Sequence, residues 1–209
     1  MKLLVLGATG GTGREILAQA LERSHDVTVL ARDPSKVSLR HARLRMLKGS
    51  LPEDAAALEE AVAGQGAVIS SLGKGNSLKS GGLIARSMPA IVSAMEKAGV
   101  RRLIVVSALG VGETRRDAPA IPRLMQRTLL ADLFADKLAG EAVLKRSRLE
   151  WTIVYPSILT NGARTSGYRH GERLELRGLP RISRADVAEF VLLQLTDPSY
   201  VRKGAIVTH

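Results

Sequence analysis

The 209-residue sequence predicts an α/β fold, a doubly wound parallel sheet with helices on both faces. Short apolar runs alternate with segments whose apolar residues recur every three or four positions, which is helical spacing. Most of these runs are apolar on both faces, as strands covered by two layers of helices are. A glycine-rich turn joins the first run to the first helical segment. The length fits a single domain over residues 1–209.

The first half of the chain supplies alternating elements, and each has a local signal. The expected strands are 2–6, 26–31, 43–47 and 67–71, and the expected helices are 12–23, 54–63 and 82–98. The run at 43–47 is the weakest of these strands. Acidic residues open the helix at 54–63, which the helix dipole favours. Gly99 ends the helix at 82–98, as glycine often does.

The second half continues the alternation but interrupts it twice. The expected strands are 102–107, 151–155 and 205–208, and the expected helices are 132–146 and 183–195. Pro156 breaks the strand before it, and Ser183, with Asp186 three residues later, opens the last helix. Segments 108–131 and 157–182 fit the alternation poorly. Both follow the carboxyl end of a strand, where open α/β sheets bind ligands, so we expect substrate and lid loops there.

The formal net charge of +11 permits nucleic acid, an acidic membrane or a small anion as partner. Aromatic residues form only 3% of the chain, which disfavours the stacking surfaces that bind single strands. Residues 1–60 are nearly balanced, whereas 164–184 hold six arginines against two acids. A basic rim on the two loops would attract an anionic substrate, although a solubilising surface is the alternative. The expected substrate contacts are Arg115, Arg123, Arg164 and Arg169.

Several classes of site are disfavoured by what the chain contains. It has no cysteine, which excludes a disulfide framework, a thiolate metal site and a cysteine nucleophile. Its four histidines are scattered without ligand spacing, so we expect no metal site. A Gly-x-Ser-x-Gly nucleophile turn is missing. No run approaches the roughly 20 apolar residues of a membrane span, and no signal peptide is recognisable. We expect a cytoplasmic protein without nucleic-acid or membrane partners.

The glycine-rich turn at residues 7–13, Gly-Ala-Thr-Gly-Gly-Thr-Gly, is the strongest functional signal. Glycine permits a tight turn and close approach of the backbone to a pyrophosphate, and the following helix offers free N–H groups to that anion. The alternative is a tight turn without a ligand. The cofactor-binding residues expected here are Gly7, Thr9, Gly10, Gly11, Thr12, Gly13 and Arg14.

The end of the second expected strand favours NADP(H) over NAD(H). An NAD enzyme usually places an acid there for the ribose hydroxyls, and an NADP enzyme places an arginine near the 2′-phosphate. This chain has Ala31 followed by Arg32, whose guanidinium can bind a phosphate with two parallel hydrogen bonds. Lys36 is a plausible second cation. Asp33 could instead be the ribose acid, so NAD(H) stays possible.

Six segments together resemble the atypical short-chain dehydrogenase/reductases, over nearly the whole chain: 7–13, 32–34, 70–73, 105–107, 150–156 and 182–188. The chain is most similar to their NAD(P)H-binding flavin reductase and biliverdin reductase B group, close to the NmrA-like proteins. This resemblance implies a Rossmann-type NAD(P)-binding fold. It also implies cofactor contacts from Ser71, Leu72 and Gly73 on the adenosine side, and from Tyr155, Pro156, Ser157 and Ile158 beside the nicotinamide.

The resemblance also implies catalytic roles for Ser107 and Lys137. In such reductases a tyrosine four residues before the lysine gives the proton, but that position here is Leu133. A further departure is Ser50, where the group usually has an acid near the adenine. The alternatives are structural roles: the Ser107 hydroxyl only terminates a strand, and Lys137 is a surface charge on the helix beside Glu141.

The expected function is an NADPH-dependent reductase that passes hydride to a flavin or another conjugated, quinone- or tetrapyrrole-like acceptor. The cofactor supplies this chemistry and the protein orients it. Two alternatives stay open: a non-catalytic NADP(H)-sensing regulator of the NmrA type, and an epimerase-like relative. The small-molecule acceptor is expected to be anionic or conjugated, and the protein to be a monomer or a homodimer.

Overall fold

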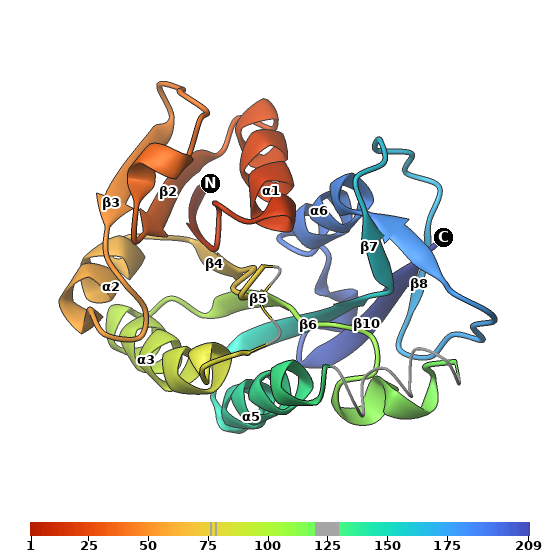
Figure 1. The fold of residues 1–209 in the computed structure, drawn as a ribbon. Helices are drawn as coiled ribbons and strands as arrows, with labels where there is room; N and C mark the ends of the chain where they lie inside the picture. The colour runs from red at the N-terminus through yellow and green to blue at the C-terminus, as the bar shows by residue number, and fades with distance from the viewer. Residues whose placement is uncertain (76, 78, 120–129) are drawn as a thin grey trace.

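An eight-stranded sheet forms the centre of the computed structural model, which describes residues 1–75, 77, 79–119 and 130–209 (Figure 1). Its strand order is β3-β2-β1-β4-β5-β6-β10-β8. These strands are β1 (Lys2–Leu6), β2 (Asp26–Ala31), β3 (Leu44–Lys48), β4 (Ala67–Ser70), β5 (Arg102–Val106), β6 (Glu150–Pro156), β8 (Arg169–Gly171) and β10 (Lys203–Thr208). The order reverses between β1 and β4, which is the position where open α/β sheets form a ligand crevice.

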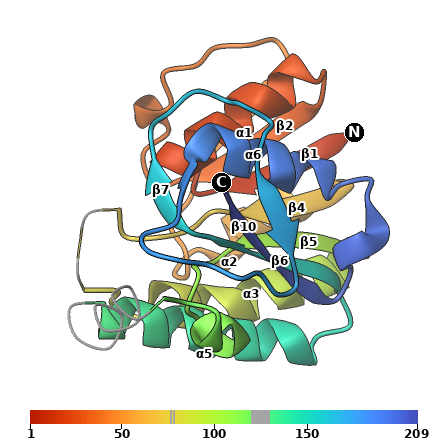
Figure 2. The same ribbon diagram turned by 90° about the vertical axis from the view of Figure 1, so that its right-hand side faces the viewer.

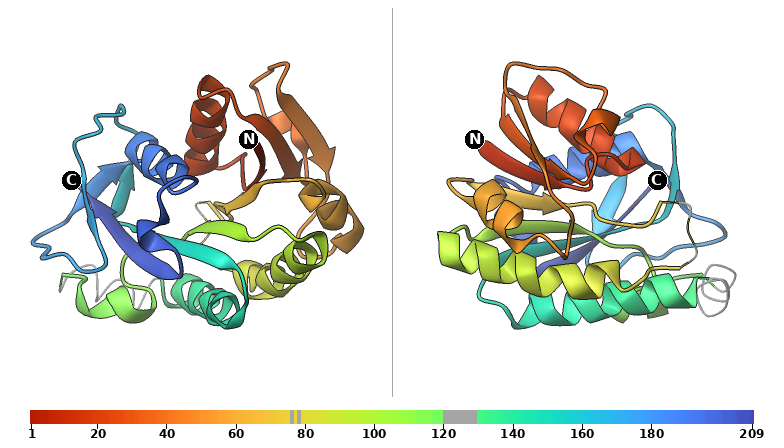
Figure 3. Two further views of the ribbon diagram at one scale, coloured as in Figure 1. Left: turned by 180° about the vertical axis from the view of Figure 1, so that it is seen from behind. Right: turned by 60° about the vertical axis from the view of Figure 1, so that its left-hand side comes forward.

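Helices cover both faces of the sheet (Figure 1, Figure 3). They are α1 (Gly11–Glu22), α2 (Ala55–Val62), α3 (Leu83–Ala98), α5 (Ala131–Arg146) and α6 (Arg184–Leu193). Alternate residues of β1 face opposite cores. Leu4 and Leu6 pack with α2, α3 and α5, whereas Leu3 and Val5 pack with α1 and α6. The predicted doubly wound α/β fold is therefore confirmed.

The structure differs from the sequence prediction at the edges of the fold. The weak third strand lies at Leu44–Lys48, one residue later than expected. Segment 157–182 contains three short strands, of which β8 pairs antiparallel with β10. The other two, β7 (Ile158–Thr160) and β9 (Arg181–Ser183), form a separate parallel pair. Across the described ranges, no helix combines the length and the apolar content that crossing a membrane requires.

The start of α3 is capped by a side chain from α5. The N-cap residue Gly82 has no side chain to accept hydrogen bonds from the first turn. Asp136 accepts them instead, from the backbone nitrogens of Ile84 at 3.0 Å and Ala85 at 2.8 Å. Gly140 lets the two helices approach, because a Cβ there would stand 2.6 Å from Cγ2 of Ile84. This contact fixes the face of α5 that points towards the sheet.

A second buried acid organises the start of α6. Ser183 caps the helix by accepting from the backbone nitrogen of Asp186 at 2.9 Å, and its hydroxyl donates to Asp186 at 2.7 Å. The same carboxylate accepts from the backbone nitrogens of Thr165 at 2.7 Å and Ser166 at 2.9 Å. It also contacts the His209 ring at 2.9 Å. The chain after β7 is thereby held across α6 (Figure 2).

Candidate functional site

The glycine-rich turn lies at the switch point, between β1 and α1. It closes through a hydrogen bond from the Gly10 nitrogen to the Gly7 carbonyl at 3.0 Å. Gly7 has a φ of +82°, and a Cβ there would stand 2.6 Å from the Ser71 carbonyl oxygen. A Cβ on Gly13 would collide with the Gly7 carbonyl oxygen. Both positions therefore require glycine.

The first turn of α1 presents its backbone N–H groups without a side-chain cap. Its N-cap residue is Gly10, and the first turn contains no acidic residue. Free N–H groups and the positive end of the helix dipole together favour an anion at this point. The turn is held against the end of β4, because Ser71 donates from its nitrogen and its hydroxyl to the Leu6 carbonyl, at 2.9 Å and 3.1 Å.

Arg184 lies against this turn, although sequence reasoning did not assign it to the site. A Cβ on Gly11 would be 2.8 Å from both Cδ and Nε of Arg184. The guanidinium donates from Nη1 to Oδ1 of Asn161 at 2.6 Å. Arg184 forms no ion pair with any residue that the structure describes. A cation with a neutral partner therefore faces the positive end of α1.

Two charged residues, Arg32 and Asp33, follow β2 and differ in their surroundings. Arg32 is exposed. Asp33 caps the short 3-10 helix Pro34–Lys36 by accepting from the nitrogen and the hydroxyl of Ser35, at 3.1 Å and 2.5 Å. These hydrogen bonds hold the pKa of Asp33 below its ordinary value. Lys36 lies 3.8 Å from the same carboxylate. Arg14 is exposed on α1.

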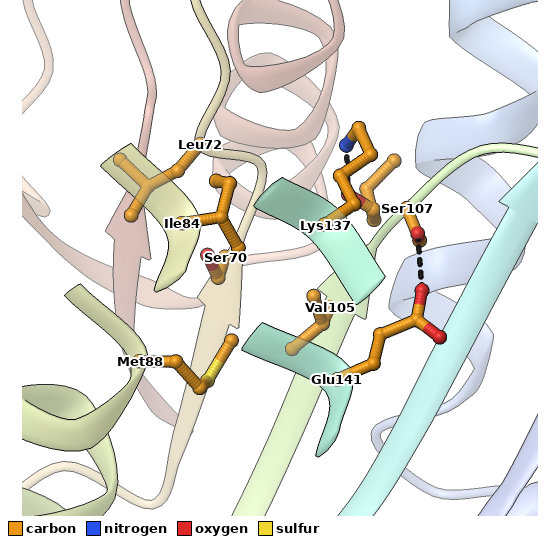
Figure 4. A pocket seen from close by; sticks show the side chains of 9 residues that line it. Ser70, Leu72, Ile84, Met88, Val105, Ser107, Lys137 and Glu141 are labelled. Carbon is orange, nitrogen blue, oxygen red and sulfur yellow. Dashed lines mark hydrogen bonds between the residues drawn. The ribbon is translucent and has the colours of Figure 1, made fainter. Parts of the chain in front are cut away.

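A pocket opens beside the turn, between β4, β5, α3 and α5 (Figure 4). It is lined by Ser70, Leu72, Ile84, Met88, Val105, Val106, Ser107, Lys137 and Glu141. Lys137 is half-buried and donates to the Val106 carbonyl at 3.5 Å. Burial lowers the pKa of this lysine, while Glu141 and Asp136 act in the opposite direction. Ser107 and Lys137, the two expected catalytic residues, are thus brought to one pocket.

Glu141 is the site residue to which sequence reasoning gave no role of its own. It is 3% exposed and lies one helical turn after Lys137. Its Oε1 accepts from the Ser107 hydroxyl at 2.5 Å, and its Oε2 accepts from the Tyr155 hydroxyl at 2.8 Å. Burial raises the pKa of Glu141, and these two hydrogen bonds only partly oppose it. Only its i+4 spacing to Lys137 was visible in the sequence.

The residues expected beside the nicotinamide lie mostly inside the protein. The Tyr155 ring packs on Gly204, where a Cβ would be 2.5 Å from Cε2, and its hydroxyl reaches the pocket only through Glu141. Pro156 and Ser157 are buried, and the Ser157 hydroxyl donates to Thr208 at 2.9 Å. Ile158 is 43% exposed. On the adenosine side, Gly73 has open space around it.

The structure does not gather the expected substrate arginines into one cluster. Arg115 is exposed in the 3-10 helix Gly112–Arg116. Arg164 lies 3.6 Å from Glu22 of α1, and Arg169 is exposed on the edge strand β8. These three arginines thus lie on three different segments of the fold. Arg123 lies outside the described residues.

The comparison with protein families decides the assignment. A family described as NAD(P)H-binding matches residues 7–198 of this chain, which run from the first glycine of the turn to near the C-terminus. The chain belongs to this NAD(P)H-binding family. The match includes the whole glycine-rich turn.

Solved structures share the architecture of this NAD(P)H-binding protein at low sequence identity. The oxidoreductase ylbE of Lactococcus lactis is 19% identical, with a TM-score of 0.83 over 99% of this chain and 90% of that chain. A short-chain dehydrogenase/reductase of Veillonella parvula in complex with NADP is 23% identical, with a TM-score of 0.82 over 100% and 94%. ChuY of Escherichia coli O157:H7, described as an anaerobillin reductase, is 22% identical, with a TM-score of 0.82 over 99% and 96%.

Proposed function

We propose that this NAD(P)H-binding protein is an NADPH-dependent reductase of a flavin or another conjugated, quinone- or tetrapyrrole-like acceptor. Within the family, the proposal places it in the atypical short-chain reductases of the flavin reductase and biliverdin reductase B group. The observation that carries it is the pocket of Ser107, Lys137 and Glu141 beside the glycine-rich turn. Polar side chains converge there on an otherwise apolar cavity, as they do in sites that orient a substrate.

The residues of the turn fit the pyrophosphate of a dinucleotide. Gly7 and Gly13 pack closely against backbone atoms of Ser71 and of the turn itself, which keeps the turn tight enough for its N–H groups to converge. The first N–H groups of α1 lack a side-chain cap, and Arg184, which forms no ion pair among the described residues, lies next to them. When bound, the nicotinamide supplies a hydride, and the protein has to position the acceptor against it.

A conjugated acceptor suits a site that lacks the usual proton donor. Leu133 occupies the position one turn before Lys137, and its side chain cannot donate a proton. An extended π-system takes hydride at an electron-poor atom and spreads the resulting charge. ChuY, a structural neighbour, is described as an anaerobillin reductase. We include segments 108–131 and 157–182 in the proposal as the loops that admit the acceptor; residues 120–129 of the first segment lie outside the described part of the chain.

NADPH oxidation with a panel of acceptors tests the proposed reaction. The panel contains FMN, FAD, riboflavin, quinones and biliverdin, and the decrease in NADPH absorbance gives the rate. We expect turnover with at least one conjugated acceptor. Tight NADP(H) binding without turnover on any of them would contradict the reductase and favour the alternative suggested by Leu133, a non-catalytic regulator that senses NADP(H).

Replacing Arg32 by alanine is expected to weaken NADPH binding about 10- to 100-fold and NADH binding by less than about twofold. The reason is that only NADPH carries the 2′-phosphate that an arginine after β2 would bind. Asp33 is engaged in capping Pro34–Lys36, which makes it a poor ribose ligand. Calorimetric titration with both cofactors measures the effect. Equal small losses for NADPH and NADH would refute the assignment.

Replacing Arg184 by alanine is expected to weaken NADPH and NADH binding equally, by about tenfold. Both cofactors share the pyrophosphate, and the guanidinium lies beside the end of α1 that would bind it. Arg181→Ala is the matched control, because Arg181 is an exposed arginine three residues earlier. A selective loss of NADPH alone, or an effect no larger than that of Arg181→Ala, would show that Arg184 does not contact the pyrophosphate.

A further inference from the structure

Both oxygens of the Glu141 carboxylate are engaged, and each connects to a different part of the protein. Oε1 accepts from Ser107, which lines the pocket, and Oε2 accepts from Tyr155, which lies inside the core. Glu141 lines the same pocket, although its side chain has almost no contact with solvent (Figure 4). A buried carboxyl that ends at a hydroxyl facing a pocket is placed to exchange a proton through that hydroxyl.

We propose that Glu141 is the acid of this site and delivers its proton through the Ser107 hydroxyl to the acceptor. The proposal rests on the proposed reductase function. It assigns to Glu141 the proton donation that the tyrosine at the position of Leu133 performs in related reductases. Ser107 touches the acceptor in this scheme, and Glu141 acts behind it.

The protonation state of Glu141 determines which way the Ser107 hydroxyl points. When Glu141 is ionised, Ser107 donates to Oε1 across the 2.5 Å contact and can only accept from a ligand. When Glu141 is neutral, its own O–H donates to Ser107, and the Ser107 hydrogen is free to point into the pocket. Only the neutral acid therefore presents a proton to the acceptor.

The proposed step balances with NADPH as reductant and the conjugated acceptor as oxidant. Bound NADPH would supply a hydride, and with it two electrons, to the acceptor and would itself become NADP⁺. The basic atom of the reduced acceptor takes the Ser107 hydroxyl proton as Ser107 takes the Glu141 proton. Glu141 is left as a carboxylate, and a proton from solvent restores it for the next cycle.

The groups around Glu141 favour its neutral form more than water does. Burial is the largest influence on its pKa, and it acts upwards. Lys137 and Lys145 from α5 act downwards, but burial lowers the pKa of Lys137, and Lys145 is paired with Glu113 at 3.0 Å. On the remaining side lies Tyr155 of β6, whose pKa is raised by burial and by Glu141 itself. Tyr155 is therefore a hydrogen-bond donor and not a competing acid.

Glu141→Gln is the first test, because the glutamine amide can still donate to Ser107 but cannot release a proton. We expect kcat to fall about 100-fold, the usual contribution of a positioned acid. In the wild type, kcat should decline as the pH rises through the pKa of Glu141, and this decline should be absent in the variant. NADPH affinity and the thermal unfolding midpoint should change little, which separates the role from a structural one.

Two further variants test the connection. Ser107→Ala combined with Glu141→Gln should be no slower than the slower single variant, because both act in one relay. Tyr155→Phe removes a hydrogen bond that stabilises the carboxylate, so the alkaline decline of kcat should move to higher pH. Additive losses in the double variant, or a decline that does not move in Tyr155→Phe, would contradict the relay.

Infrared difference spectroscopy reads the protonation state without turnover. The carbonyl absorption of a neutral carboxylic acid should be present at neutral pH in the wild type, disappear at higher pH, and be missing from Glu141→Gln. If this absorption is absent from the wild type at neutral pH, Glu141 is ionised and the inference fails, whether or not the protein turns over. If it is present but no acceptor is reduced, the proposed reductase function fails instead.

Discussion

Replacing Gly13 by alanine is expected to weaken NADPH binding by about 100-fold or more and to destabilise the protein by about 1–3 kcal/mol. The added Cβ would collide with the Gly7 carbonyl oxygen and stand 2.7 Å from the Gly7 carbonyl carbon and 2.8 Å from Cα of Ala8. All three are backbone atoms of the turn, so no side chain can move aside. The turn has to open, and its N–H groups then no longer converge on one anion.

Calorimetric titration with NADPH and thermal unfolding measure the two effects. Gly167→Ala is the matched control, since the nearest atoms to a Cβ there are 3.9 Å away and the backbone is not in the left-handed region. The control should unfold and bind NADPH like the wild type. A Gly13→Ala variant with wild-type affinity would show that the cofactor does not use this turn.

Local patterns explain why the fold and the glycine-rich turn could be predicted. The strand at Lys2–Leu6 is a short continuous apolar run, and the helix from Gly11 shows its period within a few residues. The turn between them is continuous in the sequence. The three-residue strands β7, β8 and β9 are too short to show any period, so only a gap in the alternation marked them.

Contacts that depend on sheet order were not visible in the sequence. Arg184 reaches Gly11 because α1 and α6 cover the same face of the sheet, although the two residues are far apart in the chain. The spacing of Glu141 and Lys137 suggested an ordinary helix-surface pair. The structure turns that face of α5 inward, where Ser107 from the end of β5 and Tyr155 from β6 bond to Glu141.

Replacing Asp186 by alanine is expected to lower the free energy of unfolding by about 3 kcal/mol, because several hydrogen bonds to one charged group are lost together. The carboxylate is fully buried, and its loss leaves the nitrogens of Thr165 and Ser166 and the His209 ring without their acceptor. Denaturant unfolding near neutral pH measures the effect. Asp197→Ala is the control, because the Asp197 carboxylate also caps a helix, the three-residue 3-10 helix Pro198–Tyr200 at the surface, but accepts from only one backbone nitrogen, that of Ser199. Its loss should lower the free energy of unfolding by only about 1 kcal/mol.

The same carboxylate should also make stability depend on pH in the acid range. Burial acts to raise the pKa of Asp186, but hydrogen bonds from Ser183, Thr165, Ser166 and His209 outweigh it and lower the pKa to about 2. The folded value is thus below the ordinary 3.8, so the stabilisation is complete above that value and is lost as the pH falls towards 2. The shift corresponds to about 2 kcal/mol. Asp186→Ala should therefore lose less stability than the wild type between pH 4 and 2. A parallel decline of the two proteins would show that folding does not shift the pKa of Asp186.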